Sequence, residues 1–448
     1  MRPGRTARTW IVVAAVGAVA ALALWLVMRP APPAPLASGP RVVIIGVDGL
    51  DWDITRSAIA AGRMPNLQRM VREGASGVLH SIPPFISPSI WTTIATGKRE
   101  EKHGVRRFLA DGENGALTAP ASSNMRRAQA LWQIAGSRGL TVGFVAWLVT
   151  WPAEPVNGYM ISPLFERMAG RPAQPGAERA TDDPASAAYP PELVQSLAGF
   201  VVQPEDVPYG LVASFLGTTR HLSDPEVAAR EADLRRYLAS DLTTLGLARH
   251  LMRSVPTDVS GVYFRGADLS CHTFWRHRAP GEWPDGVSPR EIETFAPVID
   301  RYYSVVDSFV GEIVGAADDA VFVVCSDHGF EGHGAPAGGD GPRIGMAMHR
   351  ETGIIVMAGP AVRRGATIED ASVLDVTPTI LAILGIPVGR DMDGRVLTDA
   401  ITERALSDRP IAFIETHEGS SAPGDGEPIP SPVDDEIKEM LRSLGYIE

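Results

Sequence analysis

The sequence predicts an α/β fold in which helices flank a mainly parallel central sheet. Continuous apolar runs, which suit strands buried on both faces, alternate along the chain with segments whose apolar residues recur at helical spacing. The first run, VVIIGV at 42–47, is followed directly by Asp48 and Gly49. With 448 residues, 45% of them apolar and 21% charged, the chain can bury a large core.

The other predicted elements follow this first strand in alternation. Pro65 just inside its start and Gly74 just past its end mark the first helix. Apolar residues at helical spacing predict a longer helix from about 289 to 314, and another helix from about 375 to 385. Further strands are predicted at 142–147, 260–264, 321–325, 353–357 and 411–415.

The segment 153–255 interrupts this alternation. Its first part, up to about residue 222, is rich in proline, glycine and alanine and carries few strong strand signals. We therefore predict a cap that is inserted over the edge of the sheet, within a main domain that spans 41–448.

The N-terminus carries a candidate membrane anchor. Three arginines precede an uninterrupted apolar stretch at 10–28, and nineteen helical residues span roughly 28 Å, close to the hydrocarbon thickness of a bilayer. Because arginines favour the cytoplasmic side, residues 1–28 predict a single-pass inner-membrane protein whose main domain faces the periplasm. Residues 29–40, rich in Pro and Ala, would be a stiff linker. The alternative is a cleaved signal peptide and a secreted protein.

The charge of the chain limits its partners. A net charge of −12 gives no basic surface for nucleic acid, and a bound phosphate ester would need local cations, for which metal ions are the obvious source. The two cysteines, Cys271 and Cys325, could form one disulfide, but their number and spacing do not decide whether they pair. The oligomeric state also stays open.

Carboxylates and imidazoles gather where predicted strands end. In open α/β sheets, ligands bind outside the carboxyl ends of the strands, so side chains from different strands meet there. Such a set suits zinc, with manganese or iron as alternatives, although each histidine alone is more often structural. The candidates next to predicted strands are Asp48, Asp268, His272, Asp327, His328 and His349.

Ser87 stands just before Pro88, at the start of a predicted helix. Backbone N–H groups at a helix N-terminus favour anions, so a hydroxyl there could act on a substrate whose transition state is anionic. Taken alone, however, the serine is better explained as the N-cap of that helix.

These motifs, in this order, resemble the alkaline phosphatase superfamily, and within it the branch of type I phosphodiesterases and nucleotide pyrophosphatases. The resemblance covers about 42–397, and the inserted segment matches least. Its most specific parts are the VDG sequence at Asp48, Thr96-Gly97 with His103-Gly104 behind it, the Asp268 and His272 pair, and the SDHG sequence at Asp327.

The resemblance implies an alkaline phosphatase-like fold and a hydrolase that cleaves phosphate esters at two divalent metal ions through a phosphoserine. The family's nucleophile stands nine residues before a Thr-Gly pair, which corresponds to Ser87. One ion would be bound by Asp268, His272 and His349, and the other by Asp48, Asp327 and His328, with Ser87 facing it.

The sequence departs from this branch at one position that bears on the substrate. Nucleotide pyrophosphatases have an asparagine soon after the His-Gly pair to hold a phosphate oxygen, and the matching position here is Phe108. This departure argues against nucleotide substrates. The basic residues nearby that could contact phosphate instead are Lys98, Arg106 and Arg107.

The same motifs also bear on which other activities of the superfamily this chain could have. Sulfatases need a C/S-x-P-x-R pattern, whereas here Pro88 follows Ser87 at once and Trp91 occupies the arginine position, which argues against sulfate esters. A phosphomonoesterase or a phosphoryl-group transferase on the same scaffold is the alternative enzyme. An alternative of another class is a membrane-tethered binding module with an inactive site.

Overall fold

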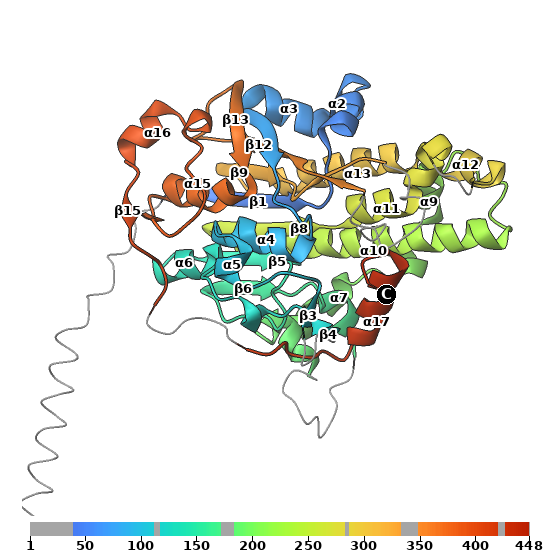
Figure 1. Ribbon diagram of the computed structural model, residues 1–448, viewed down its shortest axis with the longest axis horizontal. Helices are drawn as coiled ribbons and strands as arrows, with labels where there is room; N and C mark the ends of the chain where they lie inside the picture. Colours follow the sequence, from blue (N-terminus) through green and yellow to red (C-terminus); the bar gives the residue numbers. More distant parts are fainter. Residues whose placement is uncertain are drawn as a thin grey trace, which may run out of the picture. The chain divides into compact units, whose positions relative to one another are not determined.

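A nine-stranded sheet forms the centre of the main domain, with helices on both of its faces (Figure 1). The computed structural model describes residues 39–111, 117–171, 183–282, 286–332, 348–419 and 426–447. The strands, in their order across the sheet, are β13 (Ala366–Ser372), β2 (Ala75–His80), β12 (Thr352–Ala358), β9 (Ala320–Cys325), β1 (Arg41–Val47), β8 (Val259–Phe264), β5 (Val142–Val145), β6 (Gly158–Ile161) and β7 (Ala188–Tyr189).

The centre of this sheet is parallel and its margins are mixed. β9, β1, β8, β5 and β6 run parallel to one another. β12 runs antiparallel to both β9 and β2, and β7 runs antiparallel to β6. The predicted α/β class, with a large central sheet between helices, is therefore confirmed, and the sheet as a whole is mixed.

β1 contributes to two cores because successive side chains of a strand point to opposite faces. Val43 and Ile45 pack on one face, and Val42 and Ile44 pack on the other. The first face carries α2 (Trp52–Ala60), α3 (Pro65–Glu73), α10 (Pro225–Ser254), α11 (Gly266–Arg278) and α13 (Val298–Val314). The second face carries α4 (Ser87–Thr96), α6 (Leu131–Ser137) and α15 (Val376–Leu384).

Two predicted elements differ from the structure. The helix predicted at 289–314 is two helices, α12 (Pro289–Phe295) and α13, because Pro297 between them has no N–H to donate to a continuous helix. The strand predicted at 411–415 is only β15 (Phe413–Ile414), which pairs with β14 (Val388–Gly389) outside the main sheet.

The segment 153–255, predicted to be an inserted cap, supplies the last two strands at one end of the sheet, together with several helices. It contains β6 and β7, and its last part is the 30-residue helix α10, which packs against the core. The domain boundaries themselves stay a prediction. The smaller elements of this segment are α7 (Phe165–Met168), α8 (Leu193–Leu197) and α9 (Tyr209–Phe215).

Short elements complete the described part of the main domain. The helix α17 lies beside β4, far from it in the sequence (Figure 1). The remaining helices and strands are α5 (Glu100–His103), β3 (Leu109–Asp111), β4 (Leu117–Pro120), β10 (Gly329–Phe330), β11 (His349–Arg350), α16 (Glu403–Asp408) and α17 (Asp434–Ser443).

The predicted inner-membrane location needs correction. No helix in the described ranges is long and apolar enough to cross a bilayer. The helix with sufficient length, α10, carries charged residues along its whole course, among them Arg230, Asp241 and Arg249. The anchor predicted at 1–28, and the linker up to residue 38, lie outside the described residues.

Both cysteines have buried free thiols, so Cys271 and Cys325 do not form a disulfide with each other. Burial raises the pKa of each thiol, which keeps both thiols protonated and unreactive. Their role is therefore to fill apolar space in the two cores.

Candidate active site

Three neighbouring parallel strands bring the candidate carboxylates together. β8, β1 and β9 are adjacent, so their carboxyl ends lie at the same edge of the sheet. Asp48 directly follows β1, and Asp327 follows β9 after one residue. Asp268 lies in the first turn of α11, which begins just after β8.

Asp268, His272 and His349 form the first ligand group. Asp268 and His272 stand four residues apart on α11 and share a helix face, with Nε2 of His272 3.2 Å from Oδ1 of Asp268. Nε2 of His349, at the start of β11, lies 3.4 Å from the same oxygen and 2.9 Å from Nε2 of His272. One possible ligand atom from each residue lies within 4.8 Å of the others, close enough to share one ion.

Asp48, Asp327 and His328 form the second ligand group. Nε2 of His328 lies 3.4 Å from Oδ1 of Asp48 and 3.4 Å from Oδ2 of Asp327. Asp268 also comes within 4.8 Å of the Asp48 and His328 ligand atoms, so it lies between the two groups. The structure thus brings together all six residues that the strand ends pointed to.

Four buried ligand atoms in these groups have no hydrogen-bond partner. They are Oδ1 of Asp48, Oδ1 of Asp268, Oδ2 of Asp327 and Nε2 of His328. A buried polar atom without a partner costs about 1–3 kcal/mol, more when it is charged, so four of them facing one region need a counterpart. Carboxylate oxygens and imidazole nitrogens are the donors that zinc, manganese and iron bind, and the residues fit two divalent ions.

The electrostatics of the carboxylates point the same way. Burial raises the pKa of the Asp48 carboxyl well above its usual value, and the charges of Asp327 and Asp268 raise it further. Burial also raises the pKa of Asp327, to about 7. For Asp268, burial acts in the same direction, but the His272 and His349 imidazoles together outweigh it and hold the pKa of that carboxyl well below its usual range. Anionic Asp48 and Asp327 are therefore unfavourable unless a cation joins them.

Two histidines are oriented by backbone carbonyls. Nδ1 of His349 lies 2.9 Å from the carbonyl oxygen of Phe85, and Nδ1 of His328 lies 3.0 Å from that of Gly329. A carbonyl only accepts, so in each ring Nδ1 carries the proton and Nε2 keeps its lone pair. Nε2 is the atom that each histidine presents to its ligand group, and this is the arrangement that metal-binding histidines require.

Ser87 is the first residue of α4 and is almost fully buried beside the second ligand group. The nearby Ser87 hydroxyl lowers the pKa of the Asp327 carboxyl, against the larger effect of burial. Pro88 suits the first turn of α4, and Gly97, at φ 66°, ends the helix in the left-handed conformation. The helix N-terminus therefore places backbone N–H groups and the serine hydroxyl at one point.

Two tyrosines belong to the site although no sequence motif pointed to them. The Tyr263 hydroxyl, near the end of β8, donates a hydrogen bond to Oδ2 of Asp48. Oη of Tyr446, which follows α17, lies 2.6 Å from Nε2 of His272, 3.2 Å from Nε2 of His349 and 3.4 Å from Oδ2 of Asp268. Tyr263 could have been suspected from its place near a strand end, whereas nothing in the sequence around Tyr446 indicates its partners.

The structure does not bring the three basic candidates to Ser87. Lys98 is buried and its ammonium group pairs with Asp391 at 2.6 Å and Glu418 at 2.8 Å. Arg106 and Arg107 are exposed, and neither lines the cavity beside Ser87. The arginines that do line this cavity are Arg167 and Arg265.

One comparison with known proteins identifies a family for most of the chain. The model of the family described as type I phosphodiesterase/nucleotide pyrophosphatase matches residues 42–334. A comparison with curated protein sequences finds no match.

Several solved structures are similar at low sequence identity. Human ectonucleotide pyrophosphatase/phosphodiesterase 5 is 13% identical with a TM-score of 0.46, and the match covers 82% of this chain and 99% of that protein. Phosphonoacetate hydrolase from Sinorhizobium meliloti is 20% identical with a TM-score of 0.39, covering 66% of this chain and 58% of that one. A putative sulfatase from Bacteroides thetaiotaomicron is 12% identical with a TM-score of 0.49, covering 85% and 76%.

Proposed function

Because the chain belongs to the type I phosphodiesterase/nucleotide pyrophosphatase family, we propose that it cleaves phosphate diesters through a covalent phosphoserine on Ser87. Members of this family are phosphoric ester hydrolases, so the predicted superfamily and enzyme class are confirmed. The observation that carries the finer proposal is the buried Ser87 at the start of α4, which lines one cavity with Asp48 and Asp268, residues of the two candidate ligand groups.

The reaction balances in two displacements. Oγ of Ser87 forms a bond to phosphorus, the bond from phosphorus to the leaving oxygen breaks, and the serine proton ends on that oxygen so that an alcohol departs. Water then breaks the bond between Oγ and phosphorus, which releases a phosphate monoester and restores the hydroxyl. The Asp327 carboxylate, whose pKa the Ser87 hydroxyl lowers, is the acceptor that would orient the serine proton before attack.

The protein stabilises the charge on phosphate with fixed groups. Backbone N–H groups at the start of α4 lie beside Ser87 and would donate to equatorial phosphate oxygens without rearrangement during reaction. Two divalent ions, for which the carboxylate and imidazole ligands favour zinc, would supply Lewis-acid stabilisation of the attacking and leaving oxygens when bound. The residues that would hold them are Asp268, His272 and His349 for one ion and Asp48, Asp327 and His328 for the other.

The test compares two serines of one helix. With zinc present, the full chain is expected to cleave a nitrophenyl phosphodiester, and Ser87→Ala is expected to lose turnover on the order of 10³-fold or more while it still binds metal. Ser89→Ala is the matched control, because this buried serine bonds to Glu100 at 3.3 Å and is expected to keep activity. Mass spectrometry after acid quench should find the phosphoryl group on Ser87.

Each outcome separates the alternatives. Full turnover by Ser87→Ala would replace the phosphoserine with direct attack by water. Faster cleavage of a nitrophenyl phosphomonoester would assign the protein to the phosphomonoesterases, and transfer of the phosphoryl group to an added alcohol in place of water would indicate a transferase. Metal binding without any of these reactions would favour the inactive binding module.

A further inference from the structure

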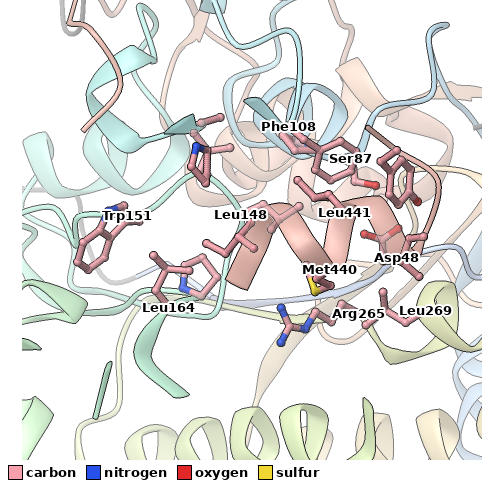
Figure 2. A pocket seen from close by; sticks show the side chains of 18 of the residues that line it. Asp48, Ser87, Phe108, Leu148, Trp151, Leu164, Arg265, Leu269, Met440 and Leu441 are labelled. Carbon is pink, nitrogen blue, oxygen red and sulfur yellow. The ribbon is translucent and has the colours of Figure 1, made fainter. Parts of the chain in front are cut away.

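An apolar cavity of about 130 Å³ opens beside the nucleophile. Ser87 and Asp48 lie at one end of it and Trp151 at the other (Figure 2). Between them the walls are made mainly of apolar side chains, including Phe108, Leu148, Trp151, Leu164, Met440 and Leu441. A group attached to a phosphorus atom at Ser87 would therefore enter apolar surroundings.

The size of the cavity limits that group. An apolar protein cavity of about 150 Å³ binds benzene. The space of about 130 Å³ therefore suits a phenyl ring or an alkyl chain of about six carbons. A larger group would have to displace the wall or extend into solvent.

The two arginines that line the cavity are already engaged by other protein groups. The Arg265 guanidinium bonds to Glu166 and, through Nε, to the Ser240 hydroxyl at 3.1 Å. The Arg167 guanidinium bonds to Glu436 at 3.2 Å. Recognition of a base or sugar requires polar groups that can turn to the ligand. These arginines are held by protein partners, so the lining favours an apolar group.

The walls come from segments that are far apart in the sequence and held under strain. One wall follows β5, where Val149 lines the cavity at φ 59°. A β-branched residue in this region costs on the order of 1–3 kcal/mol, and such strain tends to occur where a ligand is held. Another wall is α17, and Tyr446 just beyond it reaches the first ligand group, because its hydroxyl lies 2.6 Å from Nε2 of His272. The Tyr446 ring also packs against Phe108, with centroids 4.6 Å apart.

We propose that this cavity binds an apolar ester group of the substrate, an aryl ring or an alkyl chain of about six carbons, and so selects phosphodiesters that carry such a group. The proposal rests on the proposed function, because it places the phosphorus atom at Ser87. The cavity selects the ester group by excluding water from it, and the ligand groups act on the phosphate.

A binding series tests the cavity without any turnover. Zinc-loaded Ser87→Ala is titrated by calorimetry with alkylphosphonates from methyl to octyl. Affinity is expected to rise roughly fourfold for each buried methylene, then to level off near six carbons because the cavity is full. Equal affinity for methyl- and hexylphosphonate would overturn the proposal, and a rise that continues unchanged to octyl would overturn the size limit.

Two variants locate the effect. Leu148→Gln keeps the size of a half-buried wall residue but makes it polar, and it should reduce the preference for hexyl- over methylphosphonate at least about fivefold. Leu406→Gln is the matched control, because this half-buried leucine on α16 lies outside the cavity and should leave the preference unchanged. An equal loss in both variants, or in neither, would overturn the assignment of the cavity.

An activity assay distinguishes failure of the cavity proposal from failure of the proposed function. The wild-type protein is assayed on nitrophenyl methyl and nitrophenyl hexyl phosphate. Cleavage of both at equal kcat/KM, together with a flat binding series, would refute the cavity proposal and leave the diesterase intact. A rising binding series without cleavage of either diester would support the cavity and refute the diesterase.

Discussion

The two ligand groups differ in how well the protein satisfies them. In the first group, the histidine Nε2 atoms and Oδ2 of Asp268 all lie within 3.4 Å of the Tyr446 hydroxyl. One ligand atom of the first group, Oδ1 of Asp268, has no hydrogen-bond partner, whereas three atoms of the second group have none: Oδ1 of Asp48, Oδ2 of Asp327 and Nε2 of His328. The difference teaches that the first group can be accommodated by the protein's own hydroxyl, whereas the second depends more strongly on a bound cation.

The largest expected effect is on metal content when one ligand of each group is removed. Loss of a residue that only supports a ligand costs 10–100-fold in metal affinity, so Asp327→Asn and His349→Asn should each lower the affinity of one ion by more than about 100-fold. Elemental analysis should find two ions per wild-type chain and one in each variant. If Asp327→Asn still binds two ions, Asp327 is not a ligand, and the second ligand group is wrongly assigned.

Metal removal should destabilise the protein, and it should also reverse the effect of one substitution on the free energy of unfolding. An ion at 100 times its dissociation constant stabilises the fold by about 2.7 kcal/mol. Asp48→Asn should lower the free energy of unfolding when metal is present but raise it after chelation, because a buried carboxylate no longer faces Asp327 and Asp268.

A buried carboxylate three residues away provides the control for that reversal. Asp51 caps α2 through Asp53 N at 2.7 Å and pairs with Arg350. Asp51→Asn should therefore destabilise the protein both with and without metal, as measured by denaturant unfolding. If Asp48→Asn also destabilises the metal-free protein, as Asp51→Asn does, repulsion among the carboxylates of the site does not destabilise the fold.

His103 extends the comparison to a buried histidine that has partners on both nitrogens. Its Nδ1 accepts the Val105 N–H at 3.2 Å, and its Nε2 lies 3.0 Å from the Thr93 hydroxyl. Burial, with a smaller effect of the Arg126 charge, lowers the pKa of His103 to about 3. The fold therefore favours the neutral ring, and its contribution is complete above the unfolded pKa of about 6.5 and is lost as pH falls toward 3.

This shift predicts a measurable pH dependence. Between pH 7.5 and 5, the free energy of unfolding should fall by about 2 kcal/mol more in the wild type than in His103→Gln. Denaturant unfolding in both proteins after chelation removes any contribution from metal release. Parallel pH profiles would show that protonation of His103 is not resisted by the fold.

The smallest expected effect is that of the Tyr446 hydroxyl. Tyr446→Phe should lower the free energy of unfolding of the metal-free protein by about 1 kcal/mol, because the first ligand group loses its shared hydroxyl partner. Tyr209→Phe, at a side chain that is 56% exposed, is the control and should change nothing. Equal stability of Tyr446→Phe and the wild type would mean that the first group is no better satisfied than the second.

The sequence predicts the second ligand group well because its residues adjoin strands. Val42 to Val47 and Ala320 to Cys325 are continuous apolar runs, and a buried parallel strand is the simplest structure for each of them. Asp48 and Asp327 then follow from the rule that functional side chains gather at carboxyl ends of strands. That β8, β1 and β9 are neighbours, which makes the groups converge, is a long-range fact that the local pattern does not contain.

The parts that were not predicted depend on long-range contacts or weak local patterns. Tyr446 reaches His272 across 174 residues, and no local periodicity encodes such a pairing. β13, with the sequence ATIEDAS, is an edge strand that is largely exposed, so it lacks the apolar run that revealed the central strands. Lys98 follows α4 closely in the sequence, but its ammonium group pairs with Asp391 and Glu418, which are far away in the sequence.

Asp48 and Tyr446 both line the cavity, although 398 residues separate them in the sequence, so the ribosome adds Tyr446 long after Asp48. At 5–20 residues per second, roughly 20–80 s separate the first wall from the last. During that interval a nascent chain exposes the apolar lining next to unpaired ligand side chains. Chaperones that cover apolar surface are therefore expected to stay on this chain until α17 has emerged, and full metal retention is expected only after release.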